Sequence, residues 1–325
     1  MFKLKRRELL AAGVAGATLG HLPLAQAQAW PARPIKLLVP FIPGSAPDVI
    51  ARGLGERLAS GLGQAVVIEN KAGAGGNIGL EAIAKSPADG YTIGLGTSSL
   101  SINPWLYRKV GYDPIEDFTP INNTYAMPHA LIVQADSPIR SVADLVRELK
   151  ANPGKYNYAS GGNGSGAHLC AELFKSMAGV DAVHVPYRGA PEIITAVIGG
   201  SALFGFPTLS TAVPLVRAGK IRCIGVTGPK RNPALPDAPP VGESVAGFEV
   251  VSWFGIVAPA RFPADAAARI DAEIQKALAD PAFRQKVTSD GTEVFGLGHK
   301  DFPAYLRQDL QKWKRAVEVS GAKVD

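Results

Sequence analysis

From residue 34 onward, short β-rich runs alternate with segments whose apolar residues have helical spacing. Ile50, Leu54 and Leu58 show this i, i+4 pattern. Such alternation indicates an α/β fold with parallel sheets that helices cover on both faces. Because the chain has 325 residues, we expect two domains. The predicted strands are Ile35–Phe41, Ala65–Glu69, Thr92–Gly96, Ala130–Gln134, Tyr156–Ser160, Ala182–Tyr187, Ala202–Phe206 and Ile221–Thr227.

The C-terminal part of the chain departs from this alternation. Pro263–Val287 and Phe302–Val319 predict amphipathic helices that pack on the outside of a sheet. The apolar stretch Val250–Ala258, which contains Trp253, precedes them. We expect this stretch to carry the chain back from a second domain to the first.

Residues 1–29 have the pattern of a cleaved export signal. Four basic residues between positions 3 and 7 precede a short apolar run, Leu9–Leu19, and small-x-small motifs end at Ala27 and Ala29. The run is shorter than the roughly 20 residues that span a bilayer. The predicted location is the periplasm, with cleavage near Ala27 or Ala29. This signal pattern leaves open whether export follows the general secretory or the twin-arginine route.

Charge and metal-ligand spacing exclude several classes of function. The formal net charge is +6, and it falls to +3 without residues 1–29, which hold four cations and one anion. This charge is too small to indicate a nucleic-acid partner. The histidines are not paired at metal-ligand spacing, so we expect no metal and no cofactor. Whether Cys170 and Cys223 form a disulfide is left open.

Three loops share one design, in which a strand ends, small residues follow and a helix begins. In open α/β sheets, ligands bind at such strand ends. A helix N-terminus offers unpaired backbone N–H groups and a partial positive charge, which suit an anion. These loops are therefore the candidates for a binding site.

The first loop is "VPFIPGSAPDVIAR", residues 39–52. Ser45 is placed to cap the helix, and Asp48 follows three residues later in the pattern of a capping box. Asp48 therefore either satisfies backbone N–H groups of the helix start or contacts a ligand directly.

The second loop, "NKAGAGGNIG", spans residues 70–79. It is not a dinucleotide-binding fingerprint, because Ile78 stands where the third glycine belongs. We expect its glycines to let the backbone approach a cleft.

The third loop lies in "ASGGNGSGAHLC", residues 159–170. Gly161 and Gly166 have the spacing of a phosphate loop, but Ala167 and His168 replace the required lysine and hydroxyl residue. What remains is a set of N–H donors with the hydroxyls of Ser160 and Ser165. Such donors suit a small oxyanion with one charge, such as a carboxylate.

His168 raises an enzymatic alternative, a periplasmic α/β hydrolytic enzyme that uses Ser165 and His168. The stretch around Ser165 lacks the G-x-S-x-G spacing of a nucleophile elbow, so we favour a structural or ligand-orienting His168. Tyr187, in "HVPYRGAPE", either contacts a ligand or is a half-buried tyrosine at the end of a strand.

These motifs resemble, in order, the extracytoplasmic solute receptors of the tripartite tricarboxylate transporter system, also called Bug proteins. The resemblance covers essentially all of the chain after residue 29. Its motifs are "VPFIPGSAPDVIAR", "VVIENKAGAGGNIG", "DGYTIGLGT", "YASGGNGSGAHLCAELF", "VPYRGAPE", "GKIRCIGVTG" and "WFGIVAPA".

The resemblance implies a two-lobed periplasmic-binding-protein type II fold, with two α/β domains joined by two crossing strands and a ligand cleft between them. Residues 30–126 and 252–325 are predicted to form lobe one, and residues 127–251 lobe two. The implied function is capture of a small organic acid by lobe closure, for uptake by a transporter with inner-membrane subunits or for sensing. The implied ligands are di- or tricarboxylates, acidic amino acids or aromatic acids. The implied receptor is a monomer without catalytic activity.

The resemblance also selects the ligand-binding residues. The predicted set is Phe41, Gly44, Ser45, Asp48, Thr97, Ser98, Ser160, Asn163, Ser165, Gly166, His168, Tyr187, Pro207 and Thr208. Two positions depart from the family's usual pattern. Ser45 replaces a glycine of the first loop, and Leu203 stands where an aspartate is usual. The second change hints at a less polar ligand.

Overall fold

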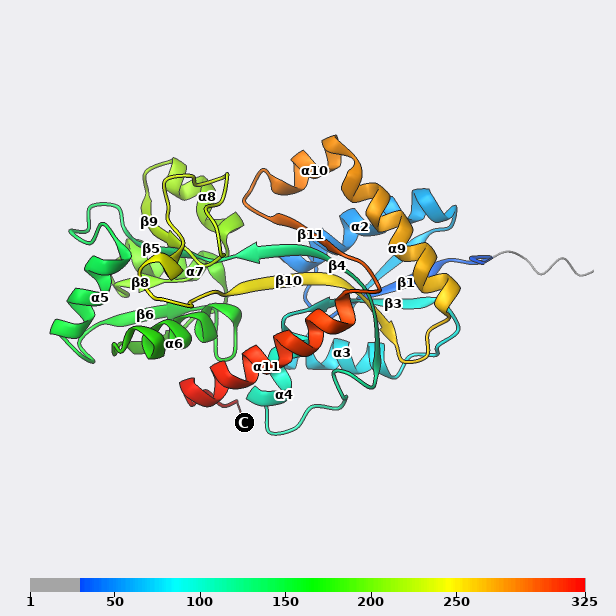
Figure 1. The fold of residues 1–325 in the computed structure, drawn as a ribbon, viewed down its shortest axis with the longest axis horizontal. Coiled ribbons are helices and arrows are strands. Elements are labelled where there is room, and N and C mark those ends of the chain that lie inside the picture. Colours follow the sequence, from blue (N-terminus) through cyan, green and yellow to red (C-terminus); the bar gives the residue numbers. More distant parts are fainter. Residues whose placement is uncertain (1–29, 325) are drawn as a thin grey trace, which may run out of the picture.

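The computed structural model describes residues 30–324. Residues 1–29, with the predicted export signal, lie outside the described residues. Figure 1 shows two lobes joined by long strands, and each lobe has its own sheet. The predicted two-lobed α/β architecture is confirmed.

The sheet of the first lobe has six strands and is mixed. β1 pairs in parallel with β2 and β3, as predicted, whereas β10 runs antiparallel to β3 and β4, and β11 antiparallel to β4. The strand order is β11-β4-β10-β3-β1-β2, with β1 at Ile35–Val39, β2 at Val66–Asn70, β3 at Thr92–Thr97, β4 at Phe118–Pro128, β10 at Val251–Pro259 and β11 at Glu293–Leu297.

The sheet of the second lobe has five strands. β6 pairs in parallel with β7 and β8, whereas β5 runs antiparallel to β8 and β9. The order is β7-β6-β8-β5-β9, with β5 at Ala130–Gln134, β6 at Asn157–Ser160, β7 at Val183–Pro186, β8 at Phe204–Gly205 and β9 at Ile221–Val226.

The prediction of purely parallel sheets was wrong, because the strands that join the lobes run antiparallel. β4 leads into the second lobe and continues past His129 into β5, and β10 returns. Figure 1 shows both strands passing between the lobes. Because the chain leaves along one strand and returns along the other, the two neighbours must point in opposite directions.

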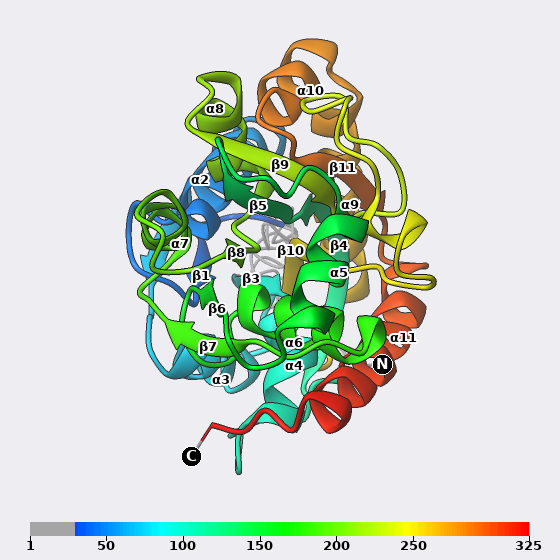
Figure 2. The same cartoon turned by 90° about the vertical axis from the view of Figure 1, so that its left-hand side faces the viewer.

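Helices cover both faces of each sheet, as predicted. In the first lobe, α2 and α9 pack on one face, and α3, α4 and the first half of α11 on the other. In the second lobe, α5 and α6 lie on one face and α7 and α8 on the other, which Figure 2 shows end-on. The helices are α2 Ala46–Leu62, α3 Asn77–Ala84, α4 Ser99–Leu106, α5 Val142–Ala151, α6 Gly166–Ala178, α7 Ala190–Ile198, α8 Leu209–Arg217, α9 Ala264–Ala279, α10 Pro281–Thr288 and α11 Phe302–Ser320.

The predicted single helix Pro263–Val287 is broken into α9 and α10. Pro281 lacks an N–H group, and the residue before a proline is biased towards extended backbone. Asp280 accordingly has φ −67° and ψ 115°, and its carboxylate accepts hydrogen bonds from the N–H groups of Ala282 and Phe283. The break therefore starts a second, capped helix.

The C-terminal helix α11 contacts both lobes. Its first half packs with Trp253 in the first lobe. Trp313 and Ala316 belong instead to a buried cluster with Tyr158 and Phe174 of the second lobe. The predicted boundaries at 126/127 and 251/252 fall near the ends of β4 and β10 and stay a prediction. Besides these two strands, α11 also links the lobes, because it packs against both.

Candidate functional site

A cleft of about 610 Å³ lies between the two lobes. The first lobe and the crossing strands line it with Phe41, Gly44, Ser45, Pro47, Gly75, Thr97, Ser98, Ser99, Ile102, Tyr107, Met127, Ser252, Trp253 and Phe254, and the second lobe with Gly161, Asn163, Gly164, Ser165, Gly166, Gly189, Ala190, Pro191, Thr208 and Thr211.

Five of the described helices begin at this cleft. Their N-cap residues are Ser45 of α2, Ser98 of α4, Ser165 of α6, Gly189 of α7 and Thr208 of α8, and all five line it. The first turn of a helix leaves backbone N–H groups without an intrahelical partner and carries a partial positive charge. The convergence therefore makes the cleft favourable for an anion.

None of the described residues that line the cleft has a charged side chain. An anion bound there is compensated by N–H donors, hydroxyls and helix dipoles rather than by a cation. The polar lining lies beside the aromatic side chains of Phe41, Tyr107, Trp253 and Phe254. The arrangement suits a small molecule that has both an anionic and an apolar part.

The first loop is organised by the carboxylate of Asp48, which is only 2% exposed. Its Oδ2 accepts from Gly44 N at 2.8 Å and from Arg52 Nε at 2.9 Å. Its Oδ1 accepts from Arg52 Nη2 at 3.1 Å and from Asn70 Nδ2 at 2.9 Å. Arg52 and these other donors outweigh burial and lower the pKa of Asp48 to about 2.

The predicted capping box is therefore wrong in its details. The Ser45 hydroxyl donates to the carbonyl oxygen of Ile42 instead of capping α2. Asp48 reaches back one residue further than expected, to the N–H of Gly44. Its position behind the loop supports the interpretation that Asp48 satisfies the backbone.

The third loop is held from within the second lobe. Ser165 caps α6 as predicted, with its Oγ accepting from His168 N at 3.2 Å. The His168 ring has other partners than that hydroxyl. Its Nδ1 accepts from Gly164 N at 3.1 Å, and the ring stacks on His184 with centroids 4.1 Å apart. Within the described residues, the Ser165 hydroxyl and the His168 ring share no hydrogen bond, so the pair lacks the geometry of nucleophile and base.

Comparison with known proteins decides the family. Residues 50–322 match the model of the tripartite tricarboxylate transporter family receptor. The chain belongs to this family. The receptor is 31% identical over 321 residues to Protein BugT of Bordetella pertussis, with 98% of each chain covered.

Two solved structures extend the comparison. The structure "R. palustris Rpa4515 with adipate" matches the receptor with a TM-score of 0.82 at 34% identity, over 91% of this chain and 100% of that chain. MatC from Rhodopseudomonas palustris, with bound malate, matches with a TM-score of 0.75 at 26% identity, over 89% and 100% of the two chains. The receptor therefore has the periplasmic-binding-protein fold that the resemblance implied.

The structure brings most of the predicted site residues of the receptor together. Those that line the cleft are Phe41, Gly44, Ser45, Thr97, Ser98, Asn163, Ser165, Gly166 and Thr208. Asp48, Ser160, His168, Tyr187 and Pro207 are not among the residues that line it. Direct ligand contact by any of these residues stays a prediction.

The predicted residues that do not line the cleft have other partners. Ser160 is fully buried, and its Oγ lies 2.6 Å from Nε2 of His184. Tyr187 packs against the buried cluster that contains α7, and Pro207 accepts a backbone hydrogen bond from Ala130 N at 2.9 Å. Leu203 packs against the core of the second lobe, so the hint of a less polar ligand finds no support at that position.

Sequence reasoning missed the lining residues that follow no binding-loop motif. Ser252, Trp253 and Phe254 lie in the apolar strand β10, which was predicted only as a connection. Gly189 and Thr211 also line the cleft. Gly189, two residues before Pro191, was a usable signal, because a glycine followed by a proline in this position is typical of a helix start, here that of α7.

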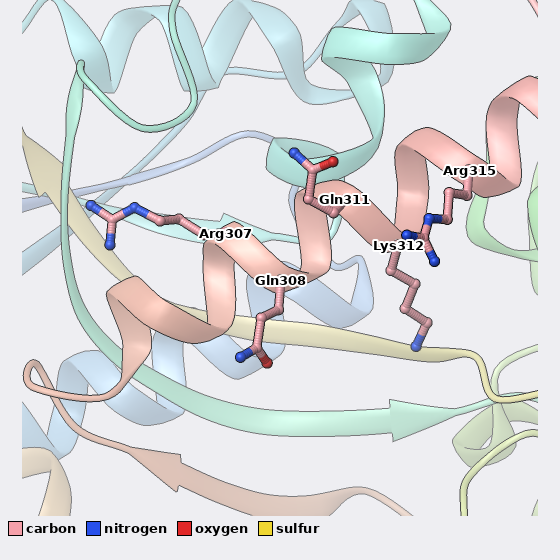
Figure 3. Close-up of a pocket in the computed structure, with 5 residues that line it drawn as sticks. All are labelled: Arg307, Gln308, Gln311, Lys312 and Arg315. Carbon is pink, nitrogen blue, oxygen red and sulfur yellow. The ribbon is translucent and has the colours of Figure 1, made fainter.

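A second hollow, of about 450 Å³, lies on the outer surface of α11. Figure 3 shows that the side chains around it all project from this one helix and point in different directions. They are Arg307, Gln308, Gln311, Lys312 and Arg315. Because all of them belong to one helix, they form an open basic surface rather than an enclosed ligand site.

Proposed function

We propose that this receptor captures a small organic acid in the periplasm and delivers it to a tripartite tricarboxylate-type transporter or to a sensing system. The observation that carries the proposal is the convergence of five helix N-termini on a cleft without charged lining side chains. Such a site binds a carboxylate through N–H groups and hydroxyls, and its aromatic part accommodates a short carbon chain. The adipate and malate in the two related structures support a carboxylate ligand.

The proposed mechanism is capture by closure. The ligand binds where both lobes contribute donors, and movement about β4 and β10 brings the lobes together around it. In this proposal the receptor works as a monomer and performs no reaction. His168 accepts a hydrogen bond within its own loop and does not line the cleft, so it supports the third loop instead of acting as a base.

The periplasmic location is part of the proposal. It is supported by the export-signal pattern in residues 1–29 and by the family. Among the described helices, none combines the length and apolarity that crossing a bilayer requires.

A thermal-shift experiment tests the proposal. The chain from residue 30 onward is purified, freed of bound ligand by partial unfolding and refolding, and heated with aliphatic dicarboxylates, citrate, acidic amino acids or aromatic acids. A ligand at one hundred times its dissociation constant stabilises the folded form by about 2.7 kcal/mol. We expect saturable stabilisation by at least one acid and none by the corresponding amide. Equal stabilisation by acid and amide, or none by any acid, would contradict the proposal.

A further inference from the structure

His129 links the two crossing segments beside the cleft. It lies between β4 and β5 and is only 3% exposed. Its Nδ1 is 2.9 Å from the carbonyl oxygen of Phe206, and its Nε2 is 3.0 Å from Oγ of Ser252. Ser252 lies in β10 and lines the cleft.

These two contacts determine which atoms of His129 and Ser252 carry hydrogen. A carbonyl oxygen only accepts, so Nδ1 of His129 carries a hydrogen and donates it to Phe206. Burial lowers the pKa of His129 to about 4, so the ring is neutral near pH 7. A neutral imidazole has only one N–H group, which leaves Nε2 as an acceptor. The hydroxyl hydrogen of Ser252 therefore points at Nε2.

As a result, Ser252 presents only lone pairs to the cleft. A serine hydroxyl has one hydrogen, and His129 holds it. Among residues 30–324, no other side-chain hydrogen bond involves the Ser252 hydroxyl. Ser99 provides the contrast, because it also lines the cleft and no described group fixes its hydroxyl hydrogen.

The Ser252 hydroxyl lies against the start of α6. A Cβ atom on Gly166 would come within 3.2 Å of Ser252 Oγ and 3.3 Å of His129 Nε2. The glycine thus allows the first turn of α6, with its unpaired N–H groups, to approach an acceptor. A ligand that binds the N–H groups at this helix start therefore lies close to Ser252.

We propose that Ser252 is a specificity-determining residue that selects acids with a hydroxyl group next to the carboxylate, and that His129 is the positioning residue that makes Ser252 an acceptor. The inference rests on the proposed capture of carboxylates. A plain acid leaves the lone pairs of Ser252 without a donor, whereas a hydroxy acid donates to them.

The lining of the cleft favours a hydroxyl over an ammonium group. Both groups donate hydrogen bonds, but an ammonium group also brings a positive charge. None of the described lining residues is a carboxylate that would pair with this charge. Burying an unpaired charge is costly, so an amino acid is expected to bind more weakly than the matching hydroxy acid.

Matched ligands test the selection by titration calorimetry. The sets are succinate, malate and aspartate; glutarate and 2-hydroxyglutarate; and propionate and lactate. One hydrogen bond contributes about 0.5–1.5 kcal/mol net, so we expect about two- to twelvefold tighter binding of the hydroxylated member of any set that binds. In Ser252→Ala this preference disappears, so that the plain and the hydroxylated acid of a set bind within about twofold of each other. The matched control, Ser99→Ala, removes another cleft hydroxyl and is expected to retain the preference.

The tautomer of His129 can be measured directly. The ¹⁵N spectrum of histidine-labelled receptor at pH 7 should show Nδ1 of His129 protonated and Nε2 bare. The opposite tautomer would overturn the inference, and so would a preference that survives in Ser252→Ala. Binding of acids without any preference for the hydroxylated member also overturns it, yet leaves the proposed function intact. Binding of no acid at all instead refutes the proposed function.

Discussion

The carboxylate of Asp48 organises the loop that the first lobe presents to the cleft. It accepts hydrogen bonds from Gly44, Arg52 and Asn70, and Asn70 Nδ2 also donates to the carbonyl oxygen of Phe41 at 2.9 Å. The change Asp48→Asn replaces one acceptor oxygen by an NH₂ group that faces these donors. We expect a less stable protein and weaker binding of the acid ligand.

The magnitude follows from the pKa of Asp48, which falls from 3.8 to about 2 on folding. At about 1.4 kcal/mol per pKa unit, ionised Asp48 adds about 2 kcal/mol to the free energy of unfolding at pH 7. Because the folded pKa is the lower one, this contribution is complete above pH 3.8 and is lost as the pH falls from 3.8 through 2. At pH 3 about half of it remains.

Urea unfolding followed by tryptophan fluorescence measures the effect at pH 7 and pH 3. Asp48→Asn should lose about 2 kcal/mol at pH 7, and its deficit should shrink by about 1 kcal/mol at pH 3. The control is Glu318→Gln, which removes an exposed partner 3.9 Å from Lys314 and should cost less than about 1 kcal/mol. A deficit that does not change with pH would refute the reasoning. Tighter binding of acids by Asp48→Asn would indicate instead that Asp48 faces the ligand.

Three other predictions concern two histidines, a glycine of the cleft and a buried aspartate. Burial lowers the pKa of His129 and His184 from 6.5 to about 4, so their contribution is complete above pH 6.5 and lost as the pH falls through 4. For His129 alone the loss is up to about 3 kcal/mol, and urea unfolding of wild type and His129→Asn at both ends of this range measures it. Gly166→Ala crowds the cleft, so calorimetry should show about tenfold weaker acid binding with little change in melting temperature; unchanged affinity would contradict this. Burial raises the pKa of Asp309, which accepts from Trp253 Nε1 at 2.7 Å. The neutral Asp309→Asn keeps an acceptor oxygen and should be at least as stable as wild type at pH 7 in thermal unfolding, whereas a loss of stability would refute this account.

Local patterns predicted the elements around the site well. The strand Ala130–Gln134 has the predicted bounds, and the predicted cap Ser165 receives the N–H of His168. These features depend on neighbours within a few residues, which the chain order shows directly.

Polar strands and apolar connections were harder to interpret. The middle of β4 contains Asn122, Asn123 and Thr124, which are fully buried although their composition does not indicate a strand. Asn122 is satisfied there by Asp271 of α9, at 2.7 Å. Because this partner lies far away in the sequence, no local pattern predicts that the asparagine is buried and hydrogen-bonded.

The sequence by itself determined where helices begin, which loops are rich in small residues and that the third loop lacks the side chains for a phosphate. The tertiary structure alone decided that five helix starts meet, that Asp48 supports its loop from behind and that His129 holds the hydrogen of Ser252. The physical reason is range. Capping and periodicity act between residues close in the chain, whereas the cleft arises from the antiparallel pairing of β4 with β10, which are more than a hundred residues apart.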